Sequence, residues 1–164
     1  MPPSPSEPFL LWDESLSSSV VPDISAAIGR PIATVWDEWP ERDLSSNPVP
    51  DQEIIPHLGG KSGHLAFWIT QDWSALGDHK LLISIHQISV LWLRGPGSRS
   101  LKRPEQSMLT IAVIERALHL ALETHSHVYL RARYDPEDGI TPILERLQGS
   151  LRDAPLQWER VPLN

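Results

Sequence analysis

One short apolar run constrains the fold of this chain more than any other stretch. Residues 65–70 read LAFWIT; they follow Gly59 and Gly60 and end at Gln71 and Asp72. Four to eight apolar, β-prone residues between turn signals indicate a strand that is buried on both faces. Such strands are usually parallel and central in their sheet. Because sites in open α/β sheets form beyond the carboxyl ends of these strands, Asp72 is a candidate site residue.

A second copy of this pattern lies near the start of the chain. Residues 9–12 read FLLW and are followed directly by Asp13 and Glu14. Two buried parallel strands that each run into an acid would place their carboxylates at the same edge of the sheet. The two runs together therefore predict an acidic site.

The other expected elements alternate between strands and helices through residue 124. Apolar spacing and turn signals predict strands at 32–36, 88–93 and 128–133, and helices at 15–27, 50–58, 74–85, 104–124 and, more weakly, 141–147. This alternation predicts an α/β fold with a parallel sheet and helices on both faces. We expect a flexible leader over residues 1–8, a single domain over 9–148 and a tail over 149–164.

Composition narrows the classes of protein to consider. The chain has 164 residues, enough for one domain with a substantial core, and it has no cysteine. Disulfides and thiolate metal sites are therefore excluded, which suits a reducing cytoplasm. No apolar run approaches the ~20 residues of a membrane span, and no signal peptide precedes the first expected strand, so we expect a cytoplasmic protein without a membrane partner.

The net charge of −7 is unevenly distributed. Residues 1–80 carry four Lys and Arg against twelve Asp and Glu, whereas residues 81–164 carry ten against nine. Binding of nucleic acid over the whole surface is not expected, because affinity for phosphate depends on basic charge. The acidic half could hold divalent cations through clustered carboxylates, or it could be a solvated acidic surface.

Three segments around the acids occur in a recognisable order. They are LLWDESLS at residues 10–17, PDQEII at 50–55 and WITQD at 68–72. Their order and spacing resemble the PIN-like nucleases of the VapC toxin type. The resemblance is strongest to a small PIN-like subfamily with an N-terminal Leu-Asp-Glu-Asn-Leu-Ser, a middle Asp-Glu-Glu-Ile-Leu and a later Val-Thr-x-Asp-x-Asp-Phe. It covers residues 9–134 of this chain.

The resemblance implies a PIN-like three-layer α/β/α domain with a central parallel sheet. It also implies a metal-dependent endoribonuclease, usually the toxin of a toxin–antitoxin pair. Its cofactor would be Mg²⁺ or Mn²⁺, and its partners would be an RNA substrate, a cognate antitoxin and, for a homodimer, a second copy of the chain.

Carried over by position, three acids would form the catalytic metal site. Asp13 follows the first strand, Glu53 lies on the short second helix, and Asp72 follows the central strand. Phosphodiester hydrolysis needs an activated water and neutralisation of charge on oxygen, and one or two hard cations supply both. Such cations take oxygen ligands, so a few carboxylates suffice.

This sequence departs from the family pattern at one acid. The second acid of the later Asp-x-Asp pair falls at Ser74. Asp78, four residues further on, is the candidate fourth metal ligand, with Glu14 and Asp51 as alternatives. The missing acid keeps a second hypothesis open, in which the PIN fold has lost catalysis and serves as a binding module. An unrelated acidic α/β protein, such as an immunity protein or a secretion chaperone, fits the charge but not the spacing of the acids.

Candidate substrate-binding residues lie beside the expected site. Thr70 could orient a ligand or bind phosphate, or it could simply favour a strand. Arg94, Arg99 and Lys102 belong to the one basic run without intervening acids. They could grip the RNA backbone or an acidic antitoxin segment, or they could form a solvated loop.

Histidine and tryptophan side chains offer two weaker hypotheses. His125 and His127 could form a zinc pair, although no third ligand has an obvious spacing. Trp39 and Trp73 lie on expected loops near the site and could stack on a base, whereas core packing is the default for the tryptophans of this chain.

Overall fold

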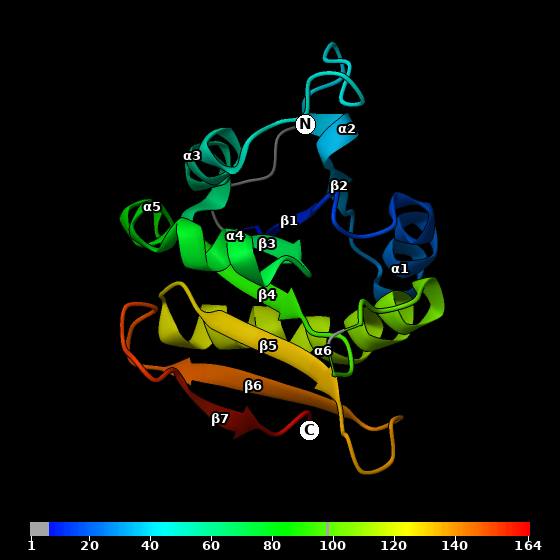
Figure 1. Cartoon of the computed structure of the whole chain (residues 1–164), viewed down its shortest axis with the longest axis vertical. Coiled ribbons are helices and arrows are strands. Elements are labelled where there is room, and N and C mark those ends of the chain that lie inside the picture. Colours follow the sequence, from blue (N-terminus) through cyan, green and yellow to red (C-terminus); the bar gives the residue numbers. More distant parts are fainter. Residues whose placement is uncertain (1–6, 98) are drawn as a thin grey trace.

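Seven strands form one sheet in the computed structural model, which describes residues 7–97 and 99–164 (Figure 1). The sheet order is β2-β1-β3-β4-β5-β6-β7. The first five strands in this order pair in parallel, and β6 and β7 are antiparallel. The strands are β1 (Phe9–Trp12), β2 (Ala33–Thr34), β3 (Ala66–Thr70), β4 (Ser89–Leu93), β5 (Tyr129–Tyr134), β6 (Pro142–Gln148) and β7 (Gln157–Val161).

Helices cover both faces of this sheet, which confirms the expected three-layer α/β/α fold. The α-helices are α1 (Val21–Ile28), α2 (Val35–Glu38), α3 (Asp51–Ser62), α4 (Trp73–Asp78), α5 (Lys80–His86) and α6 (Arg103–Thr124), with 3-10 turns at Ser18–Val20 and Gly63–Leu65. α1 and α6 pack on one face, and α3 and α5 pack on the other. In Figure 1, α6 lies behind β5, and α3 and α5 lie beside β1 and β3.

The core is divided between the two faces by the alternation of strand side chains. On the α6 face, Phe67 and Ile69 of β3 pack with Val113 of α6. On the other face, Trp68 packs with Ile54 of α3. All five residues of β3 are buried, as a central parallel strand requires. The run that most constrained the fold is therefore its central strand.

Several expected elements differ in type, length or continuity. The helix expected at 15–27 begins only at Val21, after the 3-10 turn, and the helix expected at 74–85 is divided into α4 and α5. Residues 141–147, expected as a helix, form most of β6, because residues 142–146 pair with β5. The expected strand at 32–36 keeps only two residues. Thr34 ends it by capping α2, since its hydroxyl accepts from the Asp37 backbone N–H while the Asp37 carboxylate accepts from the Thr34 N–H.

Helix α3 continues past the glycines that were expected to end it. A Cβ at Gly59 would lie 3.0 Å from the Cβ of His86 on α5. Gly59 therefore serves close helix packing rather than termination. α3 also continues through Pro56 as far as Ser62.

The two ends of the chain were expected to be a leader and a tail outside the domain. Residues 1–6 of the expected leader lie outside the described residues. Residues 149–164, expected as a tail, include β7, which pairs with β6 through Leu147 and Trp158 and through Glu145 and Arg160. In the described part of the chain, no helix combines the length and apolar character needed to cross a membrane.

Candidate carboxylate site

The carboxyl ends of β1 and β3 bring two of the expected acids to one edge of the sheet. β1 and β3 pair in parallel with Trp12 opposite Ile69, and the Asp13 N–H donates to the Ile69 carbonyl at 2.9 Å. Asp13 directly follows β1, and Asp72 lies two residues beyond β3. The predicted edge location holds for both.

Asp13 is a buried carboxylate with a fixed orientation; its exposed fraction is 6%. Its Oδ1 accepts from the Trp68 indole N–H at 3.2 Å. Its Oδ2 accepts from the Thr70 hydroxyl at 3.0 Å and from the Ser15 N–H at 3.2 Å. Three donors offset the desolvation that burial imposes on a carboxylate.

Thr70 holds both acids in place from inside the protein. Its side chain is fully buried, and its Oγ1 also accepts from the Asp72 N–H at 3.0 Å. The Ser15 hydroxyl lies 3.3 Å from the same oxygen. Thr70, expected to touch substrate, is thus placed where it orients Asp13 and the Asp72 backbone.

Asp51, at the start of α3, is the third acid at this edge. Burial, and next the charge of Asp13, raise the pKa of Asp51; Asp72 and Asp78 add to the rise, whereas His79 opposes it. The His79 Nε2 lies 3.5 Å from the Asp51 Oδ2. A rise with these causes indicates that the Asp51 carboxylate lies near those of Asp13, Asp72 and Asp78.

Glu14 belongs to the same acidic surroundings. Burial raises the pKa of the Glu14 carboxyl, and the charges of Asp13 and Asp51 raise it further, against the opposing charge of Arg42. Glu14 and Asp51 were the alternatives for a fourth acid, and the charge of Asp13 raises the pKa of both.

Glu53 is placed differently from the other two expected ligands. Its carboxylate pairs with Arg42 at 2.8 Å, and about half of its side chain is exposed (48%). Residues two apart on a helix point in nearly opposite directions, so Asp51 and Glu53 cannot face the same point. The signal for Asp51 was present in the sequence, because it lies three, four and seven residues before the buried Ile54, Ile55 and Leu58.

Ser74, at the position of the missing family acid, binds another member of the site. Its hydroxyl donates to the Asp72 Oδ1 at 2.6 Å. Asp78 is exposed and acts on Asp51 through its charge. The side chain of Trp73, a candidate for stacking on a base, lies outside the described side chains.

The acids fit a hard divalent cation in charge and donor type. Carboxylates come from the end of β1, the end of β3 and the start of α3, and carboxylate oxygens are the ligands that Mg²⁺ and Mn²⁺ prefer. No three His, Asp or Glu side chains among the described residues are gathered tightly enough to hold a metal ion. Asp13, Asp51 and Asp72 therefore match a cation in chemistry but do not form such a group in this structure.

Two of the three expected RNA-binding basic residues are engaged in the start of α6. Arg99 donates to both carboxylate oxygens of Glu105, at 2.8 and 2.9 Å. Lys102 is engaged only through its backbone N–H, which donates to the same carboxylate at 2.8 Å. Arg94 instead lines a cavity of about 180 Å³ that Gln71 and Trp92 also line, next to the carboxylate site.

Arg99→Ala is expected to lower stability at neutral pH and to have less effect in acid. Hydrogen bonds from Arg99 and then Lys102 lower the pKa of Glu105 to about 2 from 4.5. A depressed pKa contributes stability above pH 4.5 that is lost as pH falls toward 2. Because solvent screens this exposed pair, we expect only a small fall in melting temperature at pH 7. Calorimetry of both proteins from pH 7 to pH 3 checks this; a constant difference across that range would contradict it.

The other expected sites are not assembled. The His127 ring packs on Tyr129, with 5.2 Å between ring centroids, and burial followed by the charge of His64 lowers the pKa of His127. Neither His125 nor His127 belongs to a group of described residues that could hold a metal. Trp39 packs against His57, with ring centroids 4.6 Å apart.

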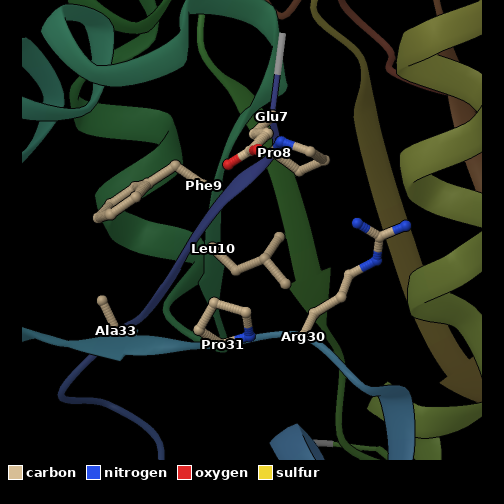
Figure 2. A pocket seen from close by; sticks show the side chains of 7 residues that line it. All are labelled: Glu7, Pro8, Phe9, Leu10, Arg30, Pro31 and Ala33. Carbon is tan, nitrogen blue, oxygen red and sulfur yellow. The ribbon is translucent and has the colours of Figure 1, made fainter. Parts of the chain in front are cut away.

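A second hollow lies at the opposite end of β1. This cavity of about 370 Å³ is lined by Pro8 and Leu10 from the β1 segment and by Arg30 and Pro31 from the segment before β2 (Figure 2). Arg30 pairs with Glu115 of α6 at 3.1 Å. The hollow is mostly apolar and lacks the grouped carboxylates of the other edge.

Comparisons with family models, curated proteins and solved structures gave no match.

Proposed function

We propose that this protein is a Mg²⁺- or Mn²⁺-dependent endoribonuclease of PIN-like type. The observation that carries the proposal is Asp13, a buried carboxylate held by three hydrogen bonds beside Asp51 and Asp72. Gathering negative charge at one sheet edge is unfavourable unless a cation or a substrate uses it.

The chain's own residues would prepare the site in distinct ways. Trp68, Ser15 and Thr70 keep Asp13 in one orientation, and Thr70 also fixes the backbone at Asp72. Asp51 faces them from α3, with His79 beside it. The bound cation would activate water and neutralise charge on the phosphate.

The toxin role, a cognate antitoxin and a cytoplasmic location belong to this proposal through the resemblance of the acid segments. A homodimer is compatible with the same resemblance. The competing function is a binding module without catalysis. One observation favours it: Ser74, in place of an acid, donates a hydrogen bond to Asp72 rather than offering a further ligand.

Two substitutions on α3 test the proposal, because one is expected to reduce cleavage and the other to leave it almost unchanged. We expect single-stranded RNA to be cut in Mn²⁺ or Mg²⁺ and spared in EDTA. Asp51→Asn should lower the cleavage rate by more than about 100-fold, beyond the usual effect of an outer-shell partner. Glu53→Gln, two residues away and paired with Arg42, should change it by no more than about twofold. Gel assays of 5′-labelled RNA measure both rates.

Two results would reject the metal-dependent nuclease. Cleavage that persists in EDTA would remove the role of the cation. No cleavage of several unrelated RNAs by the intact protein would favour the binding module. If Glu53→Gln lost activity and Asp51→Asn kept it, the nuclease would stand but its ligand on α3 would be the residue first expected from the sequence.

A further inference from the structure

Part of one face of the sheet is covered by none of the described helices. α6 covers one face, and α3 and α5 pack on the other face around β1 and β3. In Figure 1, β5 lies in front of α6, β6 and β7 lie below β5 in the view, and none of the described helices passes in front of these strands. We refer to the part of the α3 face that β4 to β7 form as the β4–β7 face. No described helix covers it over β5 to β7, but several of its side chains are buried by their neighbours, among them Ile143, Glu145 and Leu147, and Val90 of β4 packs with Ile83 of α5.

Strand register places one row of polar and aromatic residues across this face. Trp92 of β4 pairs with Arg131 of β5, Arg131 with Glu145 of β6, and Glu145 with Arg160 of β7. Cross-strand partners project from the same face of a sheet. The row draws on five strands, β3 to β7, and their register aligns it.

The same row leads to the carboxylate site. Trp92 pairs with Thr70 of β3, whose hydroxyl binds Asp13. At about 4.8 Å per strand, the row from Thr70 to Arg160 spans roughly 19 Å. A ligand lying along it would reach the carboxylates from the β7 edge.

Aromatic rings and guanidinium groups alternate on this surface. The Arg131 Cζ lies 5.8 Å from the centroid of Trp92 and 4.5 Å from that of Trp158. The two indoles are 6.2 Å apart and tilted by 49°, and the Arg94 Cζ lies 5.9 Å from Trp92. Surfaces of this composition bind single-stranded nucleic acid, because every base can stack on an aromatic ring or a guanidinium plane.

Charge on the β4–β7 face is the reverse of the charge of the whole chain. Arg131 and Arg133 both donate to Glu145, at 2.9 and 2.8 Å, so this one acid is already neutralised. Arg94 and Arg160 are exposed at the carboxyl-end side of the face. A local excess of arginine in a chain with net charge −7 is suited to a polyanion.

We infer that the β4–β7 face binds single-stranded RNA and directs it toward Asp13. Trp92 and Trp158 form the stacking platform, with the largely buried Arg131 guanidinium lying against both rings, and Arg94 and Arg160 contact the phosphates. The assignment of this RNA as the substrate rests on the proposed nuclease function, whereas the binding surface itself does not.

Binding in EDTA tests the surface without cleavage. The probe is a fluorescein-labelled single-stranded RNA of mixed sequence and about ten nucleotides, followed by anisotropy. Trp158→Ala should weaken binding by about 5- to 100-fold, and Trp158→Phe, which keeps a ring, should largely restore it. Arg160→Gln should weaken binding and reduce the slope of log K against log salt by about 1.

Arg152→Gln is the matched control. Arg152 is an exposed arginine in the turn between β6 and β7, at the opposite end of β7 from Arg160. The Arg152→Gln protein should bind the probe with the same affinity as the parent. Melting curves of each variant establish that weaker binding does not reflect unfolding; Arg160→Gln, at an exposed position, carries the test if Trp158→Ala does not fold.

The possible outcomes distinguish a failure of the proposed binding surface from a failure of the proposed nuclease function. Parental affinity in folded Trp158→Ala, or equal effects of Arg160→Gln and Arg152→Gln, would overturn the inference even if the protein cuts RNA. Loss of binding in these variants of a protein that cuts no RNA would support the surface and reject the nuclease. Oligoglutamate that binds as tightly as the RNA probe, and equally well to Trp158→Ala, would assign the face to an acidic protein segment instead.

Discussion

RNA cleavage is expected to fall below detection when Asp13 is replaced by asparagine. A neutral amide holds a hard cation poorly, and Asp13 is the acid that the protein orients most completely. The amide would also turn one of its N–H groups toward the donors of Trp68 or Thr70, which costs roughly 1–3 kcal/mol. We therefore expect the melting temperature to drop by about 2–10 °C as well.

The measurement is the initial rate of cleavage at a temperature where the variant is fully folded by circular dichroism. Asp23→Asn is the control, because Asp23 is an exposed acid in the first turn of α1 and is not among the charges that raise the pKa of Asp51. A folded Asp13→Asn protein with the parental rate would remove Asp13 from the mechanism. Loss of activity in Asp23→Asn as well would indicate a general effect of charge.

The carboxyl edge of the sheet was predictable because local sequence alone determines it. Residues 9–12 and 65–70 are apolar on both sides of the strand, so each had to lie inside the sheet, and the acids had to follow at its edge. The choice between Asp51 and Glu53 depended on the rotation of α3. That rotation is set by Ile54, Ile55 and Leu58, which pack against the sheet.

Features that depend on pairing between distant strands could not be predicted in the same way. Residues 142–148 place Ile143, Leu144 and Leu147 at a spacing that a helix also satisfies, and pairing with β5 decides in favour of a strand. The β4–β7 face depends on the order and register of four strands. Nothing local to Trp158 indicates that it meets Arg131.

Stability measurements on Asp51→Asn separate a cation site from a merely acidic surface. Burial and the charge of Asp13 raise the pKa of Asp51, so its ionised form destabilises the metal-free fold at neutral pH. Without metal, Asp51→Asn should therefore melt higher than the parent at pH 7. This advantage should disappear as pH falls through the raised pKa toward the ordinary value of 3.8, because protonated Asp51 no longer carries the unfavourable charge.

Added Mn²⁺ should reverse the order of the two proteins. A ligand that binds only the folded state adds about 2.7 kcal/mol at a hundredfold excess over its Kd. For a chain of this size, that raises the parental melting temperature by roughly 5–10 °C. Asp51→Asn should lose most of this increase, whereas Glu53→Gln, whose carboxylate is paired with Arg42, should keep it.

Sodium chloride at matched ionic strength supplies the comparison for a solvated acidic surface. Screening acts on exposed charges whichever cation provides it, so such a surface would respond alike to both salts. If Asp13, Asp51 and Asp72 hold a cation, the melting temperature should rise with Mn²⁺ and not with NaCl. If Asp51→Asn kept the full Mn²⁺ shift while Glu53→Gln lost it, the cation would bind on the Arg42 side of α3, and the buried Asp13 would need a different explanation.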